Sequence, residues 1–192
     1  MARITDQNKV DRLKQSTMKL VVAHGFGGAS AALIAKDARV ASGYFYRHYK
    51  GKYEMVNAIL QEVYQEVFNK FGEFIKEDSS FPGSIEKMIR YFVGIANSEP
   101  IKVKFLYVLT NDYNFVIDDE IRSKNLRFIE TIRNIGVASG CLDEELGVDD
   151  LYLILFIMTI QFINQKYKYA DQEQITEADI NHLLSILQKF LK

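Results

Sequence analysis

The chain has 192 residues and a net charge of −1; 48% of its residues are hydrophobic and 26% are charged, which suits an ordinary globular protein. Its one cysteine, Cys141, excludes an intramolecular disulfide and a cysteine metal cluster. The three histidines have no metal-ligand spacing, and no serine has the context of a nucleophile elbow. We therefore expect a protein that is not an enzyme and that needs no cofactor.

The charges are unevenly distributed along the chain. Residues 1–55 hold ten Lys or Arg against four Asp or Glu, whereas the remainder holds fourteen against twenty-one. A basic end joined to an acidic body is expected when one domain faces DNA and the other does not. Chance clustering on a solvated helix is the alternative if the charge distribution is considered alone.

Helical periodicity and turn residues predict an all-α fold. A first helix begins at Thr5 or Asp6 and ends near His24, with Gly25 as its left-handed last residue. A fourth helix begins near Lys52 and runs past Phe68. The later helices are expected at about Ser84–Asn97, Ile101–Thr110, Asp118–Ala138, Val148–Lys168 and Thr176–Leu191.

Between the first and fourth helices lie two short helical segments, Ala31–Ala38 and Ser42–Tyr49, with too few residues between them for an ordinary loop. This is the layout of a helix-turn-helix, in which the second helix enters the major groove of DNA. The small Ala35 is placed where a neighbouring helix must come close. Groups that can hold phosphates or read base edges occur on the second helix and just after it: Ser42, Tyr44, Tyr46, Arg47, His48, Lys50 and Lys52.

The residue types and their spacing agree with a known family at these positions: Phe26, Ile34, Ala35, Lys36, Ala38, Val40, Gly43, Phe45, Tyr46, Tyr49 and Lys52. From about Val10 to Leu60 the chain thereby resembles the N-terminal domain of TetR-type (tetracycline-repressor-like) transcriptional regulators. The resemblance implies that Tyr46 and Lys52 hold DNA phosphates. It also implies that five residues face the groove: Ser42, Gly43, Tyr44, Arg47 and His48.

Three positions depart from the family pattern. Arg39 occupies the turn position that is usually Gly, where a left-handed conformation costs roughly 1–2 kcal/mol. Ala41 replaces a capping hydroxyl at a cost of about 1 kcal/mol, unless Ser42 caps the helix instead. Ala29 likewise replaces a capping Thr, with Ser30 next in line. The alternative interpretation is a helical interaction or scaffold module that kept the fold but lost operator recognition.

We expect residues 1–52 to form the helix-turn-helix DNA-binding domain and residues 53–192 a helical ligand-binding and dimerisation domain. The segment 148–168 is apolar on nearly all sides and a capping box opens the last helix, so these two helices from each of two chains can form a four-helix bundle. The alternative is that both helices complete a monomeric core. The predicted interface residues are Leu151, Ile154, Leu155, Met158, Leu183, Leu184 and Leu187.

A ligand site is implied mainly by the resemblance, since these regulators sense small molecules in the second domain. Aromatic side chains on core-facing or neighbouring positions are candidates to line an apolar pocket, although each can also be ordinary core. They are Phe92, Phe105, Tyr107, Tyr113, Phe128, Phe156 and Phe162.

The prediction is a cytoplasmic, ligand-responsive regulator, a repressor by default, that binds a near-palindromic operator in double-stranded DNA as a homodimer. A small, largely apolar effector would release it. The first ten residues have no apolar core, so no signal peptide is expected. The most apolar stretch, Leu151–Ile163, is well short of the ~20 residues of a membrane span, and we expect no membrane association.

Overall fold

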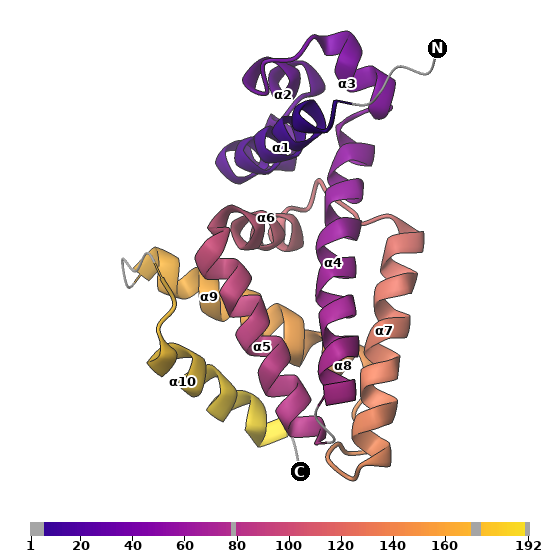
Figure 1. Ribbon diagram of the computed structural model, residues 1–192, viewed down its shortest axis with the longest axis vertical. Helices are drawn as coiled ribbons and strands as arrows, with labels where there is room; N and C mark the ends of the chain where they lie inside the picture. Colours follow the sequence, from indigo (N-terminus) through magenta and orange to yellow (C-terminus); the bar gives the residue numbers. More distant parts are fainter. Residues whose placement is uncertain (1–5, 78–79, 170–173, 191–192) are drawn as a thin grey trace. The chain divides into compact units, whose positions relative to one another are not determined.

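The computed structural model describes residues 6–77, 80–169 and 174–190, and this part of the chain contains helices and no strand (Figure 1). The predicted all-α class is confirmed. The chain divides into two compact units. Unit 1 comprises Met1–Glu62 and Lys104–Ile117, and unit 2 comprises Val63–Val103 and Asp118–Lys192. The division differs from the predicted boundary at residue 52, because unit 1 also includes a segment from the middle of the chain.

Two helices are shared by the units: α4 (Lys52–Glu77) and α6 (Pro100–Asn111). The other helices of unit 1 are α1 (Gln7–Gly28), α2 (Ala31–Asp37) and α3 (Ser42–His48). Unit 2 also contains α5 (Phe81–Ser98), α7 (Asp119–Ala138), α8 (Val148–Tyr152), the π-helical turn η1 (Leu153–Ile157), α9 (Met158–Tyr169), α10 (Glu177–Leu187) and the 3-10 turn η2 (Gln188–Phe190).

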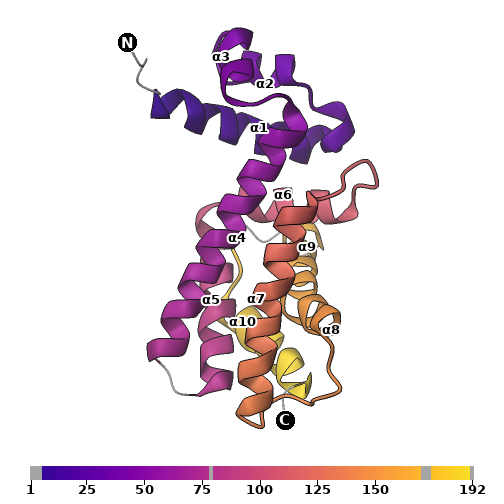
Figure 2. The same ribbon diagram turned by 90° about the vertical axis from the view of Figure 1, so that its right-hand side faces the viewer.

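In unit 1, α2 and α3 lie on the same side of α1 (Figure 2). Ile34 and Ala35 of α2 and Phe45 of α3 are completely buried, as is Leu13 of α1. Burying a side chain of this size stabilises the fold by about 1.5–3 kcal/mol, so this small core fixes both short helices. Ala35 has no atoms beyond its β-carbon, as the predicted close approach of a neighbouring helix requires.

The helix ends in unit 1 confirm one capping prediction and correct another. Ser30 caps α2, because its hydroxyl accepts a hydrogen bond from the N–H of Leu33 at 3.2 Å. Ser42 does not cap α3: the N-cap is Ala41, which makes no side-chain hydrogen bond, and Ser42 is the first helical residue. The helix-turn-helix therefore forms without the second cap, and the buried Phe45 stabilises α3 in its place.

The ends of α7 and α10 in unit 2 follow the predicted pattern. The carboxylate of Asp118 accepts hydrogen bonds from the N–H groups of Glu120 and Ile121, at 3.0 and 3.4 Å. Thr176 and Asp179 form the predicted capping box at the start of α10, with reciprocal hydrogen bonds of 3.0 and 3.3 Å.

The segment 148–169 differs from the predicted single helix. It is formed by α8, η1 and α9, so a π-helical turn interrupts it. Many of its apolar residues are buried within the chain itself, whereas Leu153 is 56% exposed. Six of the seven predicted interface residues are at most 8% exposed: Leu151, Ile154, Leu155, Leu183, Leu184 and Leu187. Only Met158 keeps partial exposure. A partner subunit would find little surface of these six residues left to cover, and their role in an interface stays a prediction.

Val148–Tyr169 is the one candidate membrane span among the described residues, on length and composition alone, with a mean hydropathy of 1.2. Its residues Leu151, Leu155 and Ile163 are almost completely buried in the chain. An apolar helix that packs its side chains against its own unit is a core helix, and we interpret it as one.

Candidate nucleic-acid interface

The helix α3 presents a polar outer side because its inner side is fixed by one aromatic residue. Phe45 is completely buried, whereas Ser42, Gly43, Tyr46 and Arg47 are exposed. The exposed fraction of Tyr46 reaches 58%. A hydroxyl, a phenol and a guanidinium therefore lie together on one short helix, which are the groups that hydrogen-bond to phosphates and base edges.

Tyr44 is half-buried, and its ring makes cation–π contacts with two neighbouring side chains. Its hydroxyl donates a hydrogen bond to the backbone carbonyl of Asp6 at 3.1 Å, and the ring of His48 lies 4.7 Å away. The cationic groups of Lys9 and Arg47 lie 5.6 and 5.7 Å from the centre of the Tyr44 ring. Such cation–π contacts contribute about 0.5–1 kcal/mol at exposed sites, and here they orient Arg47 beside α3.

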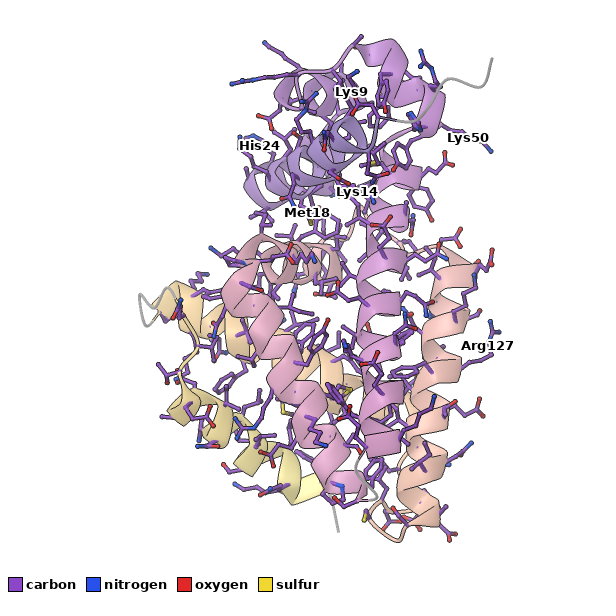
Figure 3. All side chains as sticks on the ribbon, in the orientation of Figure 1. Lys9, Lys14, Met18, His24, Lys50 and Arg127 are labelled. Carbon is purple, nitrogen blue, oxygen red and sulfur yellow. The ribbon has the colours of Figure 1, made fainter. Side chains whose placement is uncertain are left out.

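A hollow of about 380 Å³ opens between the start of α1, the α2–α3 turn and α3. Three of its lining residues are cations and one is a carboxylate; the full lining is Asp6, Lys9, Arg39, Val40, Ala41, Gly43, Tyr44 and Arg47. Lys9, labelled in Figure 3, forms an ion pair with Asp6 at 2.9 Å. The hydrogen bond from Lys9 lowers the pKa of the Asp6 carboxyl group. The hollow is therefore positively charged.

Lys52 lies apart from the residues on α3. Its ammonium group donates hydrogen bonds to the backbone carbonyls of Phe26, Gly27 and Ala29, the last two at 3.2 and 2.7 Å. It also lies 4.3 Å from the centre of the Phe26 ring. An ammonium has three N–H donors, so the end of α1 occupies all of them. By contrast, the exposed Lys50 extends away from the connection between α3 and α4 (Figure 3).

The same end of α1 is held by the segment after α6. One carboxylate oxygen of Asp112 accepts a hydrogen bond from the N–H of Phe26 at 2.7 Å. The other accepts from the N–H of Asn114 at 2.9 Å, and hydrogen bonds from Asn114 and Phe26 lower the pKa of Asp112. The rings of Phe115 and Phe26 lie 5.0 Å apart. These contacts explain why Lys104–Ile117 belongs to unit 1.

The seven aromatic residues predicted to line a ligand pocket are divided between the two units. Unit 1 contains Phe105, Tyr107 and Tyr113, and Tyr113 is fully exposed. Unit 2 contains Phe92, Phe128, Phe156 and Phe162, of which Phe92 and Phe156 are buried. Helical periodicity identifies the buried side of each helix but not which helices meet, so the role of these residues in a ligand site stays a prediction.

Unit 2 contains an aromatic cluster around Phe128 that the sequence analysis missed. The ring of Phe128 stacks on Phe68 at 3.9 Å, and Phe68 lies 6.1 Å from Tyr64. The hydroxyls of Tyr64 and Tyr152 form a hydrogen bond, and burial raises the pKa of both phenols. Tyr152 in turn stacks on Phe156, inside the π-helical turn, at 5.9 Å. The aromatic pairs 64/68 and 152/156, spaced one helical turn apart, were the available sequence signal.

No group of three or more His, Cys, Asp or Glu in the described part of the chain could hold a metal ion.

Residues 15–59 match the sequence profile of bacterial regulatory proteins of the tetR family. This segment of the chain is therefore similar to the N-terminal domain of tetR-family regulators. The match covers the second half of α1, all of α2 and α3, and the first turns of α4, so it includes the exposed polar side of α3. A comparison with curated protein sequences gives no match.

Similar solved structures extend the likeness to nearly the whole chain. A TetR family transcription regulator from Marinobacter aquaeolei VT8 has a TM-score of 0.79 and 17% sequence identity, covering 97% of this chain and 96% of that chain. The fatty acid degradation regulator FadR from Bacillus halodurans has a TM-score of 0.72 and 17% identity, covering 94% and 93%. The regulator FadR from Bacillus subtilis, solved with stearoyl-CoA, has a TM-score of 0.71 and 19% identity, covering 95% and 99%. At these identities the likeness establishes the fold.

The hydrogen bonds of Lys52 predict a large loss of stability when its charge is removed. We expect Lys52→Met to lower the free energy of unfolding by about 1.5–3 kcal/mol, because carbonyls bonded to a charged group lose their partner. The matched control is Lys50→Met, which removes an exposed cation two residues away and should change little. Urea denaturation measures both, and equal stabilities of the two variants would contradict the assignment.

Proposed function

We propose that the chain is a transcriptional repressor that binds a near-palindromic operator as a homodimer and is released by a small, largely apolar ligand. The observation that carries the proposal is the exposed polar side of α3 beside a positively charged hollow, within a segment that matches the tetR family. A DNA-binding role also explains the excess of Lys and Arg in residues 1–55. DNA as the partner makes a cytoplasmic location the natural expectation.

Within this proposal the residues of α3 have different tasks. Arg47 can donate two parallel hydrogen bonds to guanine, and the hydroxyl of Ser42 can hydrogen-bond to a base edge. Tyr46 holds a phosphate, and Gly43 leaves room for the DNA backbone because nothing lies within 4 Å of its absent β-carbon. The Tyr44 ring contacts the guanidinium of Arg47, and the ring of His48 packs in turn against Tyr44. Lys52 acts indirectly, by fixing the end of α1, rather than by touching phosphate.

A dimer is needed because one short helix reads only a few base pairs. Two copies of α3 about 34–36 Å apart would enter successive turns of the major groove, which makes the operator near-palindromic. We place the dimer interface on the outer sides of α9 and α10, where Phe162 and His182 lie 6.0 Å apart. Ile186 is half-buried and Phe190 is 44% exposed on the following turns, so apolar surface remains there for a partner to cover.

The ligand is proposed to bind at the aromatic cluster of unit 2. Flat rings can enclose an apolar molecule, and the paired hydroxyls of Tyr64 and Tyr152 can bond to its polar group. The Bacillus subtilis neighbour holds stearoyl-CoA, a molecule with a long apolar chain. A hundredfold loss of operator affinity requires only about 2.8 kcal/mol of preference for the released state.

Operator recognition is tested with fluorescence anisotropy on a duplex selected from a random pool. We expect affinity to fall steeply with salt, and Arg47→Ala to weaken binding to the selected duplex by about 1–3 kcal/mol while relaxing preference at one half-site position. A uniform loss on all sequences would show that Arg47 touches only the backbone. Salt-independent or absent DNA binding would contradict the proposal and favour an interaction module without operator recognition.

The dimer is tested by charging the exposed apolar side of the last helix. We expect Ile186→Asp combined with Phe190→Asp to make the protein sediment as a monomer, because burying an unpaired carboxylate costs about 3–5 kcal/mol. Gln188→Asp, on the opposite side of the same turn, is the control and should leave the dimer intact. A double variant that still sediments as a dimer refutes this interface.

The ligand site is tested with stearoyl-CoA as the probe. We expect saturating stearoyl-CoA to lower the affinity for the selected duplex about a hundredfold and to raise the melting temperature, since a ligand that binds the folded state stabilises it. Coenzyme A without the acyl chain is the control. If neither stearoyl-CoA nor stearic acid changes the DNA affinity, the proposal of an apolar effector of this kind is contradicted.

A further inference from the structure

The turn between α2 and α3 holds a residue in a conformation that favours glycine. Arg39 has a φ of 55°, and it is the one non-glycine residue with positive φ among the residues described. The N–H of Arg39 bonds to the carbonyl of Lys36 at 3.1 Å, and the N–H of Val40 bonds to the carbonyl of Ala35 at 3.0 Å. These two bonds form a Schellman motif, which requires a left-handed residue at this position.

The chain supplies an internal comparison at the end of α7. There the N–H of Gly140 bonds to the carbonyl of Val137 at 2.9 Å, and the N–H of Cys141 bonds to the carbonyl of Gly136 at 2.9 Å. The motif is the same, and its left-handed residue is a glycine with a φ of 71°. The same backbone geometry is therefore met by the unstrained residue in unit 2 and by a strained arginine in the helix-turn-helix.

The side chain of Arg39 lies where a cation is not needed for folding. It lines the positively charged hollow together with Lys9 and Arg47. Asp6 is the one carboxylate of the lining, and it is already paired with Lys9 at 2.9 Å. Neither guanidinium of the hollow forms a hydrogen bond or an ion pair with another residue in the described part of the chain; Arg47 contacts the Tyr44 ring and Arg39 attracts the more distant Asp37. Two unpaired cations in one hollow repel each other, and a bound anion would offset this repulsion.

We propose that Arg39 binds a backbone phosphate of the DNA strand next to the bases read by α3, and that this contact is what the strained residue supplies. A guanidinium matches the oxygens of a phosphate in a two-point fork. The hollow also includes Gly43 and Arg47 of α3, so a phosphate of the DNA that α3 approaches would lie beside it. Strained backbone of this kind is retained where the residue has a function. The inference rests on the proposed DNA binding and adds a contact that the resemblance does not assign.

The test exchanges the residues of the two equivalent turns. Arg39→Gly should raise the melting temperature by a few degrees through relief of strain, while reducing the slope of log affinity against log salt by about 0.9. That change in slope corresponds to about eightfold weaker DNA binding at 0.1 M salt. Arg39→Lys, which keeps a cation, should retain most of the slope. Gly140→Arg is the matched control, because nothing lies within 4 Å of its β-position: it should lower the melting temperature and leave DNA binding unchanged.

Random and selected duplexes distinguish a phosphate contact from a base contact. An equal loss on both supports the phosphate role, whereas a loss confined to the selected duplex overturns it in favour of base reading. If the unaltered protein binds DNA with a steep salt dependence and Arg39→Gly binds identically, this inference is wrong and the proposed function stands. If the unaltered protein shows no salt-dependent binding, the proposed function fails, and the role of Arg39 fails with it.

Discussion

The arrangement of unit 1 depends on how two charged side chains satisfy the end of α1. The last carbonyls of a helix have no hydrogen-bond partner within the helix. Here the ammonium of Lys52 donates hydrogen bonds to the carbonyls of Phe26, Gly27 and Ala29. The carboxylate of Asp112 accepts a hydrogen bond from the N–H of Phe26, which directly follows the kink at Gly25. A cation from the start of α4 and a carboxylate from the segment after α6 thus meet at one helix end. Because only Ala29 and Ser30 separate α1 from α2, this junction limits how α2 can be oriented on α1.

The turn near the end of α1 and the turn between α2 and α3 both contain a residue with positive φ, but their steric requirements differ. Gly25 has a φ of 70° and a ψ of 172°, a region open essentially only to glycine, and a β-carbon there would lie 3.1 Å from the Asp112 carboxylate. Arg39 lies in the ordinary left-handed region, which other residues can enter at a cost. The fold therefore demands glycine at the first turn and only favours it at the second. This leaves the second turn able to carry a functional side chain.

Local sequence patterns predicted the helix-turn-helix and the polar residues exposed on α3, whereas contacts between distant parts of the chain could not be predicted. The spacing of two short helices and the type of residue on α3 are local, so the helix-turn-helix, the Ser30 cap and the Thr176–Asp179 capping box could be read from the sequence. Periodicity also marked Leu183 and Leu187 as buried, but it could not tell burial in the chain from burial against a partner. The pairing of Tyr64 with Tyr152 joins residues far apart in sequence, which no local pattern reveals. The same holds for Lys52, whose acceptors lie more than twenty residues earlier.

In the proposed dimer, two α3 helices related by twofold symmetry bind half-sites that lie one turn of DNA apart. Hydroxyl-radical footprinting of the purified protein on its selected duplex tests this most directly, because it maps the protected sugars on each strand. We expect two protected patches related by twofold symmetry, with centres about 10–10.5 base pairs apart, a distance of about 34–36 Å. A single protected patch, or protection spread evenly without symmetry, would contradict it.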